Sequence, residues 1–212
     1  MPVPDGLHIL ADFKTFAVVE KPRGLLSVPG ILEKDCVSER FKKMFPQSIA
    51  QPSVHRLDWE TSGILVLAKT KESHRNISIQ FQDRKTSKRY IAVVDGIVEA
   101  AAGRIELPFR LDVENRPYQI YDEEHGKIGI SLWQKLSVEA GCTRIEYTPI
   151  TGRTHQLRLH SMHPKGLGFP IVGDCLYGTG TDVFHMKLHA SYLKFKNPEN
   201  GEMLEFNSQP PF

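Results

Sequence analysis

An aspartate stands among other reactive side chains in residues 55–63, a polar stretch that directly precedes an apolar run. This residue, Asp58, has histidine, arginine, threonine and serine as near neighbours. A carboxylate on a loop that enters a rigid strand is well placed to act as an acid, a base or a nucleophile. The structural alternative is a turn, because Asp before Thr-Ser-Gly is common turn chemistry. Taken alone, the stretch leaves both roles open.

A second stretch, residues 151–160, contains two arginines, two histidines and a glutamine but no acidic residue. Guanidinium groups near a helix N-terminus favour anions, either a phosphate or a carboxylate such as that of Asp58. The alternative is the solvated basic face of a helix. His155, His160 and His163 are spaced by five and three residues without an acid between them, which does not fit the H-E-x-x-H pattern. We therefore predict no metal site.

The third candidate is Tyr90, which opens an apolar strand pattern directly after Lys88 and Arg89. A tyrosine at this place could stack on a nucleic-acid base or take part in proton transfer. The alternative is an ordinary half-buried strand residue. The chain has no P-loop, no G-x-G-x-x-G and no G-x-S-x-G motif, so nucleotide cofactors and serine hydrolase chemistry are disfavoured.

Short strands and a few helices must position these residues. A strand at 16–20 ends before Pro22, because proline cannot donate to a ladder, and a short amphipathic helix ends at Pro46. Thr70 is placed to cap a helix that runs to about Arg84. The other elements expected are strands at 64–68 and 90–94, a helix after residue 152, and hairpins at 128–138 with 142–150 and 188–195 with 203–206. Hairpins in place of regular βαβ units predict an α+β fold.

The composition is ordinary for a globular protein. The chain has 212 residues, a mass of 24.0 kDa, 40% hydrophobic residues and a net charge of +2. These values predict one catalytic domain over residues 1–212 and exclude collagen-like, coiled-coil and wholly disordered chains. An anionic partner must then be held by local patches, such as residues 69–89 with seven basic and two acidic side chains. The chain has three scattered cysteines, no signal-peptide pattern and no apolar run close to the ~20 residues that a membrane helix needs. We therefore predict a soluble cytoplasmic protein.

Five segments, in this order along nearly the whole chain, resemble motifs of the RluA-type family of pseudouridine synthases. Residues 55–63 match H-R-L-D-x-x-T-S-G, and residues 151–160 match T-G-R-x-H-Q-[IL]-R-x-H. The other three are similar to K-P-x-G-L-L at 21–26, K-x-Y-x-A-x-V beginning at Lys88, and P-I-x-G-D-x-x-Y-G at 170–178. The resemblance implies a pseudouridine-synthase fold with a mostly antiparallel mixed sheet, a few flanking helices and a central catalytic cleft. It also implies an RNA isomerase that needs no cofactor, metal or nucleotide.

The resemblance also assigns site residues. Asp58 matches the catalytic aspartate, which acts as a nucleophile at C1′ or as a base at C2′. Tyr90 matches the tyrosine that stacks on the uracil, and Arg153 matches the arginine that keeps the aspartate ionised. Arg56 is expected to fill the space left by the extruded base. Leu157, one turn after Arg153, is expected to press on the flipped base or on the tyrosine ring. The other residues expected to contact substrate are His55, Thr61, Lys21 and Lys88.

The expected partner is structured RNA, bound by a monomer that has neither an S4 domain nor a membrane contact. Residues 25–30 and 115–117 with Gln119 look most like the subgroup that modifies a tRNA anticodon-loop uridine and large-subunit rRNA, although the connection at 160–168 is longer. One alternative is a noncatalytic RNA-binding module, for which a decayed Asp, Tyr or Arg position is expected. The other is a metal-dependent hydrolase that uses the histidine-rich stretch.

Overall fold

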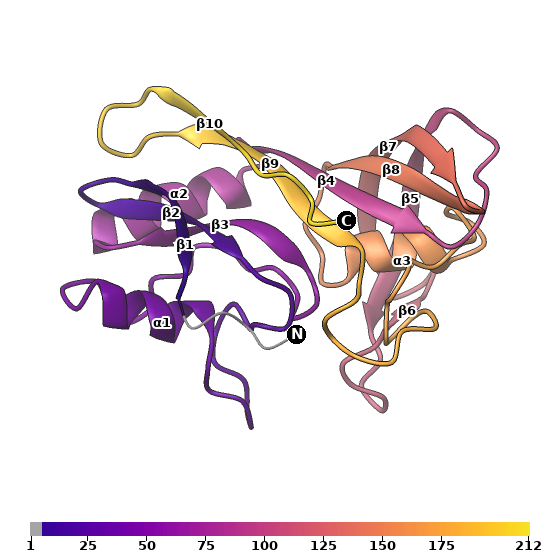
Figure 1. Ribbon diagram of the computed structural model, residues 1–212, viewed down its shortest axis with the longest axis horizontal. Coiled ribbons are helices and arrows are strands. Elements are labelled where there is room, and N and C mark those ends of the chain that lie inside the picture. Colours follow the sequence, from indigo (N-terminus) through magenta and orange to yellow (C-terminus); the bar gives the residue numbers. More distant parts are fainter. Residues whose placement is uncertain (1–5) are drawn as a thin grey trace. The chain divides into compact units, whose positions relative to one another are not determined.

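The computed structural model describes residues 6–212, so the N-terminal residues 1–5, where no signal peptide is expected, lie outside the described residues. The chain forms two compact units (Figure 1). The first unit runs to Lys88 and resumes at His189–Phe212, and the second comprises Arg89–Leu188. No helix within residues 6–212 has both the length and the apolar character of a membrane span.

The first unit contains a sheet and two helices. Its elements are β1 (His8–Asp12), β2 (Phe16–Lys21), α1 (Val37–Met44), β3 (Ser62–Ala68), α2 (Lys71–Gln82), β9 (Leu188–Lys196) and β10 (Met203–Asn207). The strand order is β1-β2-β3-β9-β10, in which β3 and β9 are parallel and every other pair is antiparallel. The short strand β1 is an element that the sequence pattern did not indicate.

β3 forms the centre of this unit because all seven of its residues are buried. A continuous apolar run, as opposed to an alternating one, is what a strand covered on both faces requires. Val66 packs in one cluster with Phe16 of β2 and Ile77 of α2. The loop that carries Asp58 therefore leads directly into the most buried strand of the unit.

The second unit is an antiparallel sheet with one helix. Its elements are β4 (Ser87–Val94), β5 (Ala102–Leu111), β6 (Gln119–Tyr121), β7 (Lys127–Glu139), β8 (Cys142–Pro149) and α3 (Gln156–Met162). The strand order is β4-β8-β7-β5-β6. β7 and β8 form the predicted hairpin across Ala140 and Gly141, which have φ values of 50° and 79°. β5 and β6 were not indicated by the sequence pattern.

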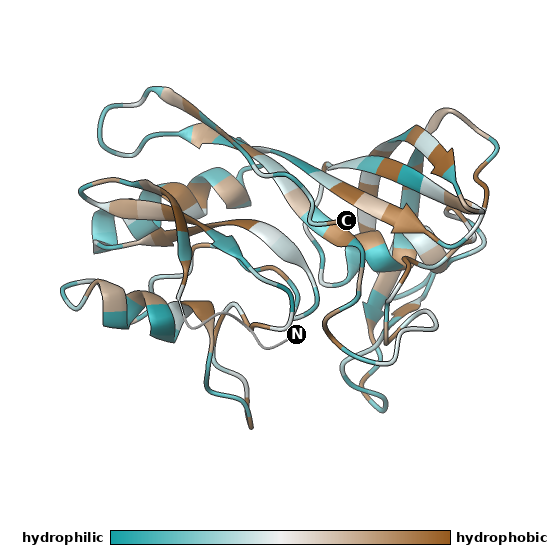
Figure 2. Ribbon diagram, in the orientation of Figure 1, coloured by the Kyte–Doolittle hydropathy of each residue, from teal (hydrophilic) through white to brown (hydrophobic). Residues whose placement is uncertain are grey.

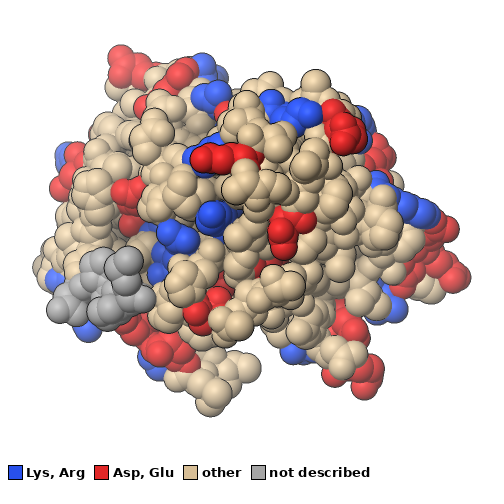
Figure 3. All heavy atoms as spheres, turned by 45° about the vertical axis from the view of Figure 1, so that its right-hand side comes forward, with Lys and Arg blue, Asp and Glu red and all other residues tan. Residues whose placement is uncertain are grey.

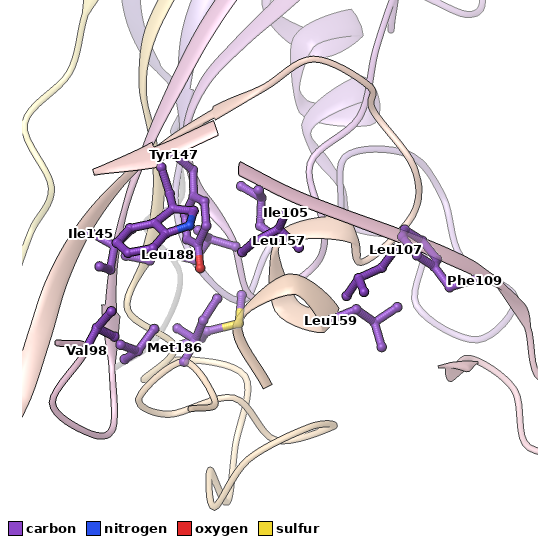
Figure 4. Close-up of a cluster of buried hydrophobic side chains, with 14 residues drawn as sticks. Val98, Ile105, Leu107, Phe109, Ile145, Tyr147, Leu157, Leu159, Met186 and Leu188 are labelled. Atoms are coloured by element: carbon purple, nitrogen blue, oxygen red, sulfur yellow. The ribbon is translucent and has the colours of Figure 1, made fainter. Parts of the chain in front are cut away.

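The core of the second unit lies between α3 and the sheet. Leu157 and Leu159 of α3 share one cluster with Ile105 and Leu107 of β5 and Tyr147 of β8 (Figure 4). Hydrophobic residues are concentrated along the strands, whereas many loops are hydrophilic (Figure 2). The combination of a parallel strand pair, antiparallel pairs and helices in residues 6–212 confirms the α+β prediction.

Candidate active site

Asp58 lies on the loop that leads into β3, and hydrogen bonds hold the main chain on both sides of it. Before Asp58, the N–H of Leu57 donates to Ser27 Oγ (3.0 Å), and the Ser27 hydroxyl donates to Leu57 O (2.7 Å). After it, the N–H of Thr61 donates to Asp58 O (3.1 Å) and closes a turn. The turn predicted as the structural alternative therefore exists, but it uses the main-chain carbonyl. The carboxylate of this half-buried residue takes no part in the turn.

Lys21, the last residue of β2, holds this loop from inside the first unit. Its side chain has no exposed surface. Its ammonium group donates to three main-chain carbonyls, those of Pro22 (3.0 Å), Trp59 (3.0 Å) and Thr61 (2.7 Å). Burial lowers the pKa of Lys21 to about 7, against the opposing effect of the Asp58 and Glu60 charges. The structure corrects the prediction that Lys21 contacts RNA: the buried ammonium positions the Asp58 loop instead.

The exposed side of the loop carries Arg56 and Trp59, on either side of Asp58. The indole Nε1–H of Trp59 donates to Gly24 O (2.8 Å), and the N–H of Gly24 donates to Trp59 O (3.1 Å). Gly24 has a φ of 74°, a conformation that glycine adopts without strain from a Cβ. The exposure of Arg56 is compatible with its predicted contact with substrate, which stays a prediction.

His55 and Thr61, both predicted to contact substrate, are engaged in or enclosed by the protein. His55 Nε2 accepts a hydrogen bond from the N–H of Val66 (3.1 Å), and its ring stacks on that of Phe81 with centroids 4.2 Å apart. Burial lowers the pKa of His55 to about 3, so the ring is neutral and its proton is on Nδ1. Thr61 is buried. In the structure His55 supports β3 and the main chain of Thr61 closes the turn, and the contact of both residues with substrate stays a prediction.

A buried chain of hydrogen bonds holds the first residue of β3, and sequence reasoning missed it. Ser62 Oγ bonds His189 Nδ1 (2.9 Å), His189 Nε2 bonds Ser208 Oγ (2.9 Å), and the Ser208 hydroxyl donates to Glu20. An ionised carboxylate only accepts, so Ser208 accepts from His189 Nε2–H and His189 Nδ1 accepts from Ser62. Burial lowers the pKa of His189 to about 4 and keeps the ring neutral. No sequence pattern links these four residues, because they are far apart along the chain.

The basic stretch at 69–89 is less available to RNA than its charge suggests. Several of its cations pair within their own unit: Lys69 with Asp12, Lys85 with Asp83 (2.9 Å) and Arg89 with Glu146 (3.6 Å). Lys88 lies over the Phe81 ring (5.9 Å), and burial lowers its pKa, so its contact with substrate stays a prediction. Lys71, Arg75 and Arg84 are exposed. Basic and acidic side chains are interspersed over the face drawn in Figure 3.

In the second unit, Tyr90 pairs with Tyr147 across β4 and β8 and packs against the hydrophobic cluster that contains Leu157. Leu157 is 7% exposed. Its burial beside Tyr90 is compatible with the predicted contact with the tyrosine ring, and its contact with a flipped base stays a prediction.

Arg153 lies exposed on the loop before α3, and Gln156 holds that loop in place. Gln156 Oε1 accepts from the N–H of Arg153 (3.0 Å) and from the Thr151 hydroxyl (2.6 Å). Its Nε2 group donates to Ile130 O (3.0 Å) on β7. The glutamine of this motif therefore determines the course of the main chain at the arginine.

The Asp58 loop, β4 and the loop before α3 all lie within one stretch of the chain that is similar to known proteins. Residues 15–163 match the family model described as RNA pseudouridylate synthase. The chain belongs to this family. Among its relatives is the "Dual-specificity RNA pseudouridine synthase RluA" of Yersinia pestis, 40% identical over 210 residues that cover 96% of this chain and 99% of that protein. The protein of the same name from Escherichia coli K12 is 39% identical over 217 residues, with 100% and 96% covered.

Solved structures of pseudouridine synthase domains have the same fold as this chain. Human RNA Pseudouridylate Synthase Domain Containing 1 has a TM-score of 0.81 at 26% identity, covering 100% of this chain and 87% of that one. Human RNA Pseudouridylate Synthase Domain Containing 4 has a TM-score of 0.76 at 25% identity, covering 96% and 88%. These comparisons confirm the RluA-type resemblance, the fold and the activity class: the protein is an RNA pseudouridine synthase, an isomerase.

In this pseudouridine synthase, residues 151–160 are not the solvated basic face of a helix. Arg158 is buried and forms a two-pronged pair with Asp174, with N–O distances of 2.8 and 2.6 Å. His160 is also buried, with its ring edge-on to that of Phe109, and burial lowers its pKa to about 4. Of the two arginines in the motif, Arg153 is the exposed one and is therefore the one able to meet an anion.

Proposed function

We propose that this pseudouridine synthase isomerises a specific uridine of structured RNA, in a tRNA anticodon loop, in large-subunit rRNA or in both. The observation that carries the proposal is the Asp58 loop, whose main chain is tied down by Ser27 and Lys21 while the carboxylate stays out of the turn. The dual-specificity relatives, aligned over 96% or more of each chain, support more than one target. The motif-like residues 25–30 and 115–117 point to the same subgroup.

The proposed reaction breaks the N1–C1′ bond of uridine, turns the uracil and joins C1′ to C5. N1 gains a proton and C5 loses one, so the product is an isomer and the balance requires no redox partner. The Asp58 carboxylate acts either as the nucleophile at C1′ or as the base that takes the C2′ proton. Both routes require the ionised form of Asp58.

Tyr90 and Arg153 complete the proposed set of catalytic residues. Tyr90 stacks on the uracil and assists removal of the C5 proton, and the Arg153 guanidinium pairs with the Asp58 carboxylate and orients it, because a planar guanidinium matches the geometry of a carboxylate. All three residues stand in motifs of the family, which supports their joint role. Because the three residues come from both compact units, we also propose that residues 1–212 act as one catalytic domain.

We further propose that the protein acts as a monomer in the cytoplasm. Its three cysteines are free thiols, as is usual for proteins of that compartment.

Pseudouridine mapping in cells that lack this protein tests the proposed targets. We expect a pseudouridine to disappear from a tRNA anticodon loop, from large-subunit rRNA or from both, and to return when the wild-type chain is supplied. Retention of every such pseudouridine in the deletion strain would show that the target assignment is wrong.

Arg56→Lys should lower the rate on structured RNA by about 10- to 100-fold, with binding less affected. Extruding a stacked base costs roughly a few kcal/mol, and a planar guanidinium can stack in the vacated space whereas an ammonium cannot. A substrate whose target uridine is already unpaired and poorly stacked should restore part of the rate. Single-turnover rates on both substrates measure this. If Arg56 is only a phosphate contact, the substitution will have equal and small effects on both, since the charge is kept.

A further inference from the structure

The exposed side of the catalytic loop presents an aromatic ring next to the reactive carboxylate. Trp59 directly follows Asp58 and is 41% exposed. Leaving a large aromatic residue in water forgoes the favourable burial that such side chains otherwise contribute. The proposed reaction uses Asp58 and Arg56 but assigns nothing to this ring.

The indole is held by its edge. Its Nε1–H donates to Gly24 O (2.8 Å), while the carbonyl of Trp59 accepts from the N–H of Gly24 (3.1 Å) and from Lys21 Nζ (3.0 Å). The polar atom of the ring and the main chain are thus fixed by the first unit itself. A side chain held in this way has little freedom to lose on binding, which is the requirement for a preorganised contact surface.

The chemistry around Trp59 indicates what would cover it. Within four residues the loop presents the cation of Arg56, the carboxylate of Asp58 and the indole of Trp59. A nucleotide offers a partner for each: a phosphate for the cation, the reacting ribose for the carboxylate and a base for the ring. An apolar protein surface or a lipid would instead have to cover the neighbouring carboxylate without a partner, which is costly.

We propose that Trp59 is a stacking platform for the base next to the uridine that is isomerised. This inference rests on the proposed function, because the position of Asp58 at the target ribose is what brings the neighbouring base to Trp59. Every base has a π face, so the contact tolerates any neighbour, and a purine, with its larger ring system, should bind best. Trp59 is then a substrate-binding residue that favours targets in loops, where the neighbouring base is unpaired.

Tryptophan fluorescence provides a direct test because the chain has two tryptophans. The other, Trp133, is buried on β7, so Trp133→Phe leaves Trp59 as the sole indole reporter. The probe is a tRNA anticodon stem–loop RNA with a uridine in its loop. We expect the RNA to quench Trp59 fluorescence, and the quenching to be lost when the base on one side of the target uridine is replaced by an abasic residue. Unchanged fluorescence at saturating RNA would overturn the proposal.

The affinity for the same stem–loop tests the energetic contribution. Trp59→Leu should weaken RNA binding between about 5-fold and about 150-fold, the usual range for loss of one base–aromatic stack. Trp59→Phe should recover part of this loss. Both variants lose the hydrogen bond to Gly24, so the difference between them isolates the ring. The matched control is Ile79→Ala on α2 of the same unit, where Ile79 is 42% exposed, and it should bind like the wild type.

A variant-by-substrate cycle separates this inference from the proposed function. On the abasic RNA, the wild type and Trp59→Leu should bind equally; a loss that persists there would overturn the stacking contact. If the wild type shows a base-dependent Trp59 effect but makes no pseudouridine in any of the proposed RNAs, the proposed target fails while the base contact stands. If pseudouridine forms and Trp59→Leu binds and reacts like the wild type, the proposed function stands and the platform is wrong.

Discussion

Asp58→Asn is expected to reduce pseudouridine formation by at least about 10⁴-fold, because an amide can neither attack C1′ nor take the C2′ proton. The change keeps the shape of the side chain, and the turn is formed by the Asp58 carbonyl and the N–H of Thr61, which the variant retains. RNA affinity and the melting temperature should therefore stay near the wild-type values. Release of tritium from RNA labelled at C5 of uridine measures the reaction, since C5 loses its hydrogen.

The control for this substitution is Asp83→Asn, which makes the same chemical change at an exposed aspartate following α2. Asp83 pairs with Lys85 on the surface, and exposed pairs of this kind contribute little to stability. This control should react at the wild-type rate. Turnover by Asp58→Asn comparable with that of the control would remove Asp58 from the reaction.

Lys21→Met should abolish a rise in stability that the wild type shows on going from pH 7 to pH 10. The pKa of Lys21 is about 7 in the folded protein against 10.5 when exposed, so between these values the unfolded chain binds more protons than the folded one. Raising the pH therefore favours the folded state, by up to about 1.4 kcal/mol per pH unit. Below pH 7 both states are protonated and the contribution to the slope disappears. Urea unfolding of both proteins across this range gives the difference directly.

The same substitution should slow catalysis. The Lys21 ammonium holds the carbonyls of Trp59 and Thr61, which follow Asp58 on the loop, and methionine has no donor to replace it. A misplacement of a reacting group by about 1 Å can cost about 10²-fold in rate. We expect kcat to fall by this order while RNA affinity changes less. Equal pH dependence of stability in the two proteins, together with an unchanged kcat, would exclude the positioning role of Lys21.

The fold class was predictable because its signals are local. The run of apolar residues in β3, the cap at Thr70 and the turn at Ala140 and Gly141 are each determined by a few neighbouring residues. Thr70 Oγ1 accepts from the N–H of Ser73 as predicted, and α2 ends at Gln82, close to the expected end at about Arg84. β5 alternates buried and less buried residues as a strand covered on one face does, but it contains a proline, which argues against a strand in the sequence.

One glycine of the catalytic motif is required for a reason that only the tertiary structure shows. Gly63 closes the catalytic motif at a φ of 117°, and a Cβ there would lie 2.3 Å from the carbonyl oxygen of Ala190 on β9. Strands β3 and β9 can pair in parallel at this point because no side chain intervenes. The partner lies more than a hundred residues away, so the sequence alone offers no sign of the contact.

The sequence by itself determined the family, the fold class and the reactive residue types, because contiguous motifs around Asp58, Tyr90 and Arg153 can be read along the chain. Only the tertiary structure decided which polar side chains of those motifs are available to RNA. Lys21 and Arg158 look like surface cations in sequence, yet both are buried, with Lys21 hydrogen-bonded to Thr61 O and Arg158 to the Asp174 carboxylate. Burial depends on contacts between residues far apart along the chain, and neither composition nor spacing carries that information.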